Sequence, residues 1–357
     1  MNKENKESNL VAREPIYFSY MIRLVSFFAV VLFHFNMAIV QFFPNSMLLG
    51  KLSYLNQSVG DIAISLFIIT SGFSLEMSTR GKFSLKKYLA KRAISIYPAF
   101  WICYLLVGMF LFLFSGHLTG DGHHSKFILS LIGLDGFFLY RMENYYLVGE
   151  WYTGYMLLTY LLFPFLLIGI RLNAAITSII VLTIFSVLYV NYDSIFKVYI
   201  NCNPIMRLPD FMFGMLFSKF IYSNKNKFYA SGLLSILIIS VLVIFLKNIP
   251  SQLYMLIFGC SLYSMLAMLF NLFRNIKVLV TPVTYLANLT FTAFLLHHQI
   301  IYFLFGKLDY SQMTHVEAFY FYFSICFLSL TLSYILKTPI KFLEDFMKSM
   351  LLKKNAI

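Results

Sequence analysis

The stretch MIRLVSFFAVVLFHFN, residues 21–36, places an arginine and a histidine inside an otherwise apolar run. A membrane-spanning helix needs about 20 largely apolar residues, and residues 17–40 supply them. A charged side chain inside such a helix costs about 3 kcal/mol or more, so it usually faces a polar cavity and marks function. The stretch therefore predicts a membrane fold and a functional site within it.

The composition of the whole chain indicates the same class. Hydrophobic residues make up 60% of the chain and charged residues 12%, and the mean hydropathy is +0.76. A soluble domain carries about a quarter charged residues, so we expect a polytopic membrane protein. The net charge of +13 comes from basic residues in short connections between apolar runs. There they set orientation and meet lipid headgroups, so they do not indicate nucleic-acid binding. The four cysteines are scattered without metal-type spacing, and we predict no metal centre.

The apolar runs predict an all-α transmembrane bundle of about ten spanning helices. A further apolar piece, 127–140, has too few residues to cross comfortably and is predicted to be a short non-spanning helix, either re-entrant or lying on the surface. The expected spans are 17–40, 58–78, 94–115, 151–170, 174–190, 205–222, 228–247, 251–273, 281–305 and 316–337.

The charged connections predict the orientation. TRGKFSLKKYLAKR, residues 79–92, carries six basic residues and no acid, so we expect it in the cytoplasm. Two spans precede it, which places the N-terminus in the cytoplasm, and the basic C-terminal segment is expected there too. The predicted organisation is a cytoplasmic tail (1–16), a transmembrane domain (17–337) with an external excursion (116–149), and a basic cytoplasmic tail (338–357).

Arg23 and His34 are predicted to lie on one face of the first helix, because eleven residues return to within about 20° of the start. Each has an ordinary interpretation: Arg23 can extend to the inner headgroups, and His34 can bond a neighbouring helix. Together they suggest a water-accessible tunnel, with a cation at its inner mouth for an anionic ligand and a deeper imidazole for proton transfer. His297 in TYLANLTFTAFLLHHQI is expected near the level of His34, with the adjacent His298 as a packing residue.

Several motifs follow one another in a fixed order along nearly the whole chain. Arg23 and His34 open the series, SGF at 71–73 lies in the second helix, and GEWYTGYMLLTYLLFP contains Trp151. The others are Arg92 with Tyr97 and Pro98, RLPDFMFGM with Arg207, and FTAFLLHHQI with His297. This ordered set resembles the integral-membrane acyltransferase family 3, whose members resemble O-acetyltransferases.

The resemblance implies transfer of an acyl group, usually acetyl, from cytoplasmic acyl-CoA to a sugar hydroxyl of a surface polysaccharide or its lipid-linked precursor. Acyl-CoA would be a co-substrate, with no permanently bound cofactor. The expected setting is a bacterial plasma membrane, with membrane lipid and polysaccharide assembly proteins as further partners.

The resemblance also implies roles for single residues. We expect His34 to act as general base or transient acyl carrier, with Arg23 and His297 as the other catalytic candidates. Four residues are expected to bind the donor: Arg23, Arg92, Ser71 and Gly72. For Ser71, a cap of its own helix is an equal alternative, and for Gly72 the main expectation is a close helix contact. Trp151 and Arg207 are candidates for acceptor binding. The ordinary alternatives are an interfacial anchor for the tryptophan and an ion pair with Asp210 for the arginine.

This chain also departs from the family pattern. Many relatives carry a glutamate five residues after the tryptophan, where this chain has Met156. Glu150, which precedes Trp151, is not expected to replace it. Larger relatives add an extracytoplasmic hydrolase-like domain, and without one we expect direct transfer or a partner.

Two other functions remain open at the level of sequence. One is a transporter or flippase for a glycan or acyl intermediate, although no pair of broken repeat helices supports it. The other is a non-catalytic subunit of a polysaccharide synthesis complex.

Overall fold

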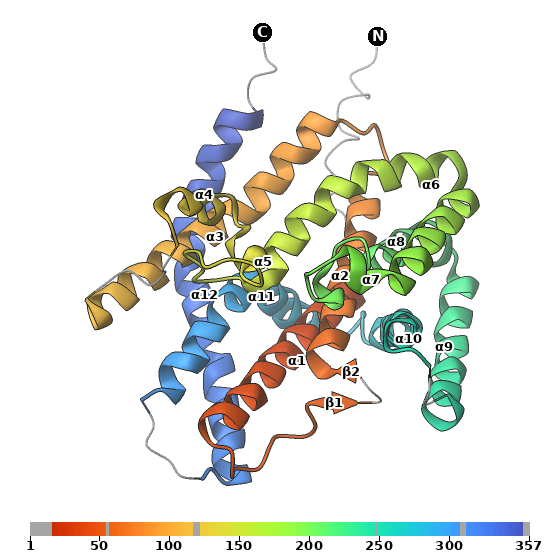
Figure 1. Ribbon diagram of the computed structural model, residues 1–357. Coiled ribbons are helices and arrows are strands. Elements are labelled where there is room, and N and C mark those ends of the chain that lie inside the picture. Colours follow the sequence, from red (N-terminus) through yellow and green to blue (C-terminus); the bar gives the residue numbers. More distant parts are fainter. Residues whose placement is uncertain (1–15, 55–56, 117–121, 247–248, 308–311, 353–357) are drawn as a thin grey trace.

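The protein is almost entirely helical in a computed structural model, which describes residues 16–54, 57–116, 122–246, 249–307 and 312–352 (Figure 1). The expected tail 1–16 lies outside this part of the chain except for its last residue. The strands β1 (Ser53–Tyr54) and β2 (Gln57–Ser58) form one antiparallel hairpin between the first two helices. The all-α fold predicted from the sequence is confirmed.

The helix α1 (Tyr17–Phe42) lies at the centre of the bundle. It packs against α2 (Val59–Ser78), α10 (Ser251–Asn271) and α11 (Lys277–Phe305). Phe27, Val31 and Phe35 of α1 are fully buried. Burial of large apolar side chains between helices gives close van der Waals packing, which is what holds helices together in lipid. One face of α1, in the segment that contains Arg23 and His34, therefore lies in the interior of the helix bundle.

Eight helices among the described residues are long and apolar enough to span a membrane: α1, α2, α3 (Leu85–Ser115), α6 (Glu150–Val190), α9 (Lys225–Phe245), α10, α11 and α12 (His315–Leu352). The predicted number of spans, about ten, is larger than this number because of two places in the chain. The predicted spans 151–170 and 174–190 are the two arms of α6, which bends at Asn173. The predicted span 205–222 is the short α8 (Leu208–Leu216) with its π-helical continuation η3 (Phe217–Tyr222).

The bend in α6 has a local cause in Asn173, whose backbone is not helical (φ −155°, ψ 105°). Its side-chain oxygen accepts a hydrogen bond from the backbone N–H of Ile176 at 3.0 Å. This is the capping interaction of a new helix N-terminus. The second arm is therefore a helix with its own start, as the sequence predicts. It leads through α7 (Tyr192–Ile195) and η2 (Ile200–Cys202) to α8.

The excursion between α3 and α6 contains two short helices, where one was expected. After a single 3₁₀ turn, η1 (His124–Lys126), α4 (Phe127–Ile132) ends at Gly133, and α5 (Asp135–Phe138) follows. Gly133 has φ +75°, a left-handed conformation that ends a helix and that glycine adopts without steric cost. Neither helix is long enough to span.

The basic segments lie at one end of the bundle. The first turns of α3, which belong to the basic stretch 79–92, and the C-terminal end of α12 are close to the top of Figure 1. The helix α12 runs to residue 352, so the basic stretch from 338 continues this helix and does not form a separate tail. Because both segments lie at one end, they can lie on the same side of a membrane. That this side faces the cytoplasm stays a prediction.

Candidate active site

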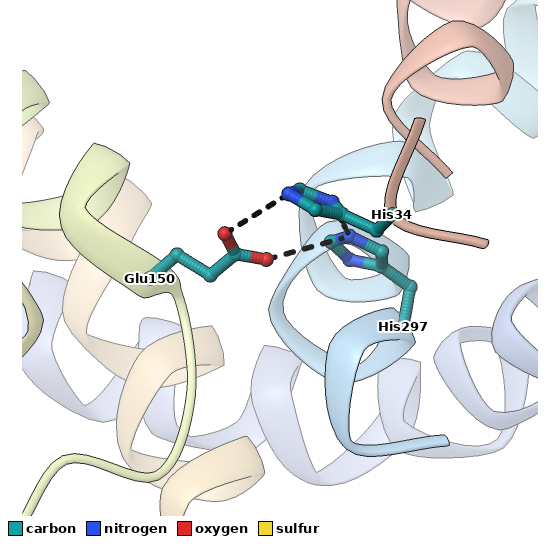
Figure 2. Close-up of side chains that lie close together, drawn as sticks. All are labelled: His34, Glu150 and His297. Atoms are coloured by element: carbon teal, nitrogen blue, oxygen red, sulfur yellow. Dashed lines mark hydrogen bonds and ion pairs between the residues drawn. The ribbon is translucent and has the colours of Figure 1, made fainter. Parts of the chain in front are cut away.

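His34 of α1 and His297 of α11 meet at the centre of the bundle (Figure 2). His34 Nδ1 lies 2.9 Å from His297 Nε2, and His297 Nδ1 lies 2.5 Å from the carbonyl oxygen of Phe294. His297 is fully buried, whereas 17% of the His34 side chain is exposed. The two histidines that the sequence places at similar depth are thus hydrogen-bonded to each other.

Glu150, the first residue of α6, completes the group. Its carboxylate oxygens lie 3.3 Å from His34 Nε2 and 3.6 Å from His297 Nε2 (Figure 2). Glu150 was not expected to replace the family's glutamate, yet its carboxylate lies beside both histidines. Met156, at the position of the family's glutamate, lines a neighbouring cavity.

His298, expected to be only a packing residue, also lies near this carboxylate. Its Nδ1 is 3.9 Å from Glu150 Oε1, and its ring centre is 5.2 Å from that of His34. About a quarter of its side chain remains exposed (27%). His298 therefore adds a third imidazole to the surroundings of Glu150.

Hydrogen-bond partners fix the tautomers of the two bonded histidines. Because a carbonyl oxygen only accepts, His297 Nδ1 carries a proton and donates it to Phe294. In a neutral ring His297 Nε2 then has a lone pair and accepts from His34 Nδ1–H. This leaves the lone pair of His34 Nε2 facing Glu150. The hydrogen bond to His297 thus orients the imidazole of His34, as the partner of a catalytic base does.

The same nitrogen and oxygen atoms could instead coordinate a metal ion. One ligand atom each of His34, Glu150 and His297 lies within 4.8 Å of the others. In the hydrogen-bonded arrangement, however, the single lone pair of His297 Nε2 is engaged by His34. An imidazole nitrogen cannot accept this bond and coordinate a metal with the same lone pair. The hydrogen-bonded geometry is that of an imidazole oriented by a second imidazole.

The group opens into a cavity of about 260 Å³, here called the histidine cavity. Trp151 lines it, and so does Asp61 at the start of α2. The remaining lining residues are Val30, Phe33, His34, Ser58, Gly60, Ile64, Glu150, Tyr152, Tyr199, Cys202 and Phe294.

A second cavity, of about 430 Å³, contains Arg23 and Arg92, and is here called the arginine cavity. Neither guanidinium belongs to an ion pair with a described residue, and Arg92 Nε is buried without a hydrogen-bond partner there. Ser71 lines the same cavity and is hydrogen-bonded to the Tyr160 hydroxyl at 2.9 Å. Unpaired guanidinium groups are suited to bind phosphate or carboxylate.

The two cavities are neighbours, and no common tunnel is observed among the described residues. Tyr152 of α6 and Phe294 of α11 line both of them, with ring centres 5.4 Å apart in an edge-to-face arrangement. The expectation that Arg23 and His34 line one tunnel is therefore corrected. They lie on either side of an aromatic constriction.

Besides the buried His297, two predicted site residues line neither cavity. Arg207 is fully buried, and its Nε is 3.2 Å from Asp210 in an ion pair. Gly72 packs against α8, where a Cβ atom would lie 2.1 Å from the carbonyl oxygen of Phe211. The structure thus supports the ion pair for the arginine and the close helix contact for the glycine.

Comparisons with known proteins agree with this geometry. Residues 16–338 match the model of acyltransferase family 3, described as "Acyltransferase domain". The acyltransferase MdmB of Streptomyces mycarofaciens is 33% identical over 86 residues, which cover 24% of this chain and 22% of that protein. No solved structure matches the chain significantly. The family match covers most of the chain, and this multi-pass membrane protein therefore belongs to acyltransferase family 3.

Proposed function

We propose that the protein transfers an acyl group, acetyl in the first instance, from cytoplasmic acyl-CoA to a hydroxyl of a surface glycan or its lipid-linked precursor. Its setting would be the plasma membrane of a bacterium. The observation that carries this proposal is the hydrogen-bonded group of His34, His297 and Glu150. It opens into the cavity lined by Trp151 and Asp61, and a cavity with two unpaired arginines lies next to that one.

The donor enters the arginine cavity. Arg23 and Arg92 bind its phosphates, because a guanidinium matches the geometry and charge of phosphate oxygens. Arg92 also lies over the rings of Tyr88 and Tyr160, 6.0 and 5.6 Å from their centres, which hold the guanidinium in place. The thioester end then points toward Tyr152 and Phe294, beyond which lies His34.

The acceptor hydroxyl enters the histidine cavity and donates its hydrogen to His34 Nε2. Its oxygen attacks the thioester carbonyl carbon, the carbon–sulfur bond breaks, and His34 returns the proton to the CoA thiolate. Acyl-CoA and the alcohol thus become the ester and free CoA. Glu150 stabilises the imidazolium that forms, and His297 holds the ring in the required tautomer.

Purified protein in liposomes, supplied with labelled acetyl-CoA and lipid-linked glycan, tests the proposal. His34→Ala removes the base and is expected to lower the transfer rate by about 100-fold or more. Arg23→Ala removes a phosphate contact and is expected to raise the KM for acetyl-CoA by about tenfold, with a smaller change in kcat.

His124→Ala is the matched control, since His124 is exposed in the excursion and lines neither cavity. It should transfer label at the rate of the unsubstituted protein. Transfer that survives in His34→Ala, with intact folding of all variants, would contradict the assignment of the base.

A further inference from the structure

The two cavities are sorted by charge. The arginine cavity is lined by Arg23 and Arg92, and no acidic residue lines it in the described part of the chain. The histidine cavity is lined by Asp61 and Glu150, and among the described residues neither lysine nor arginine lines it. Charges in a site partly shielded from water act strongly on whatever enters it, so the two cavities favour different ligands.

Asp61 is held so that one of its oxygens stays available. Ser58 caps the N-terminus of α2, accepting from the Asp61 backbone N–H at 2.9 Å and donating to Asp61 Oδ2 at 2.7 Å. Within the described residues, Oδ1 makes no hydrogen bond. Both Asp61 and Trp151 line the cavity, so a free carboxylate oxygen and an aromatic side chain border the same space.

Asp61 is the acidic residue of the histidine cavity that takes no part in the proposed proton transfer. With one proton shared between His34 and Glu150 that pair is neutral, and Asp61 remains charged. Without this proton, Glu150 adds a second negative charge. Asp61 therefore provides the charge that any acceptor meets before and after proton transfer.

We infer that the histidine cavity selects an acceptor by charge: it takes a neutral or amine-bearing hydroxyl compound and repels an anionic one such as a uronate. Asp61 is the selecting residue, because its Oδ1 accepts from a hydroxyl or ammonium group and repels a carboxylate. The inference rests on the proposed function, which assigns the acceptor to this cavity. To the proposed function it adds the chemical class of the acceptor and a selecting residue, Asp61, which is not one of the motif residues named from the sequence.

The chain offers an internal probe for this inference. It has two tryptophans, Trp101 and Trp151, and Trp151 lines the histidine cavity. Trp101→Phe leaves Trp151 as the single tryptophan, whose fluorescence is then followed. Binding in nanodiscs is then titrated with three β-1,4-linked disaccharides: cellobiose, its diuronate and the glucosamine dimer. They share one skeleton and differ in the charged group that they carry.

We expect the diuronate to bind about tenfold more weakly than cellobiose, and the glucosamine dimer at least as tightly. Asp61→Asn keeps the size of the side chain and removes the charge, so it should bring the diuronate to within about threefold of cellobiose. Asp193→Asn is the control, since Asp193 is an exposed acid that does not line the cavity. It should leave the ratio unchanged.

Equal binding of cellobiose and the diuronate, a ratio that Asp61→Asn does not alter, or no fluorescence response to any sugar would each overturn the inference. The titration needs neither donor nor turnover. Charge-selective binding without acyl transfer would therefore count against the proposed function alone, while acyl transfer that treats neutral and anionic acceptors alike would count against the selection alone.

Discussion

Glu150 has an unusual backbone at the position where its carboxylate meets the histidines. Gly149 and Glu150 have φ of +84° and +45°, so two successive residues adopt left-handed conformations. A Cβ at position 149 would lie 2.2 Å from Thr153 Oγ1, which explains the glycine. For glutamate this conformation is strained, and such strain persists where the surrounding structure enforces it, commonly at functional sites. The turn aims the carboxylate at His34 and His297.

The charge of this carboxylate is the property that the proposed reaction uses. Glu150→Gln keeps the shape of the side chain but cannot stabilise the imidazolium of His34. We expect kcat for acyl transfer to fall by about 100-fold, with the KM for acyl-CoA unchanged, because Glu150 does not line the arginine cavity. Steady-state kinetics in liposomes measure both constants. Glu143→Gln, at an exposed position in the excursion, should behave like the unsubstituted protein. Full kcat in the Glu150→Gln variant would show that the carboxylate is not used.

At the scale of elements, α2 and α8 touch through two glycines. A Cβ at Gly72 would lie 2.1 Å from the carbonyl oxygen of Phe211, and a Cβ at Gly214 would lie 2.1 Å from that of Ile69. The backbones therefore approach too closely for any larger residue, as small residues permit between membrane helices. This contact also positions Ser71, the neighbour of Gly72, at the arginine cavity.

Alanine at either glycine must push α2 and α8 apart. We expect Gly72→Ala and Gly214→Ala each to destabilise the protein by about 1–3 kcal/mol, the usual cost of overpacking. Thermal unfolding in detergent would record this as a lower Tm. Gly81→Ala is the matched control, since no atom lies within 4 Å of a Cβ at that position. Equal Tm values for all three variants would mean that the helix contact is not tight.

At the scale of the whole molecule, the sequence predicts those parts that follow from hydropathy and helical periodicity. These include the apolar segments, the bend that separates the arms of α6, and the shared face of Arg23 and His34. It does not predict Glu150 at the histidines, because that contact joins α6 to α1 and α11 through a left-handed turn that no periodic pattern signals. The division into two cavities is missed for the same reason, since Tyr152 and Phe294 belong to different helices.

In the proposed reaction, this division requires the acyl group to pass the aromatic constriction formed by Tyr152 and Phe294. Tyr152 also contacts Trp151 and Tyr155, so its ring has little room to move, and Phe294 closes the other side. An acyl group that passes between these two rings must fit the space that they leave. The constriction is therefore expected to set the acyl length that the enzyme transfers.

Phe294→Ala opens the constriction while the backbone carbonyl that accepts from His297 remains. We expect kcat/KM for butanoyl-CoA to rise by about tenfold relative to acetyl-CoA, since a few buried methylene groups are worth about 1–3 kcal/mol in a fitted pocket. Competition between the two labelled donors in liposomes measures the ratio. Truncating a buried phenylalanine also costs about 3–5 kcal/mol of stability, so Phe305→Ala, at a buried position of the same helix that lines neither cavity, is the control for that loss. It should lower stability without changing the donor ratio. If both variants change the donor ratio equally, loosened packing explains the change and an opened passage does not. The proposed passage of the thioester between Tyr152 and Phe294 is then wrong.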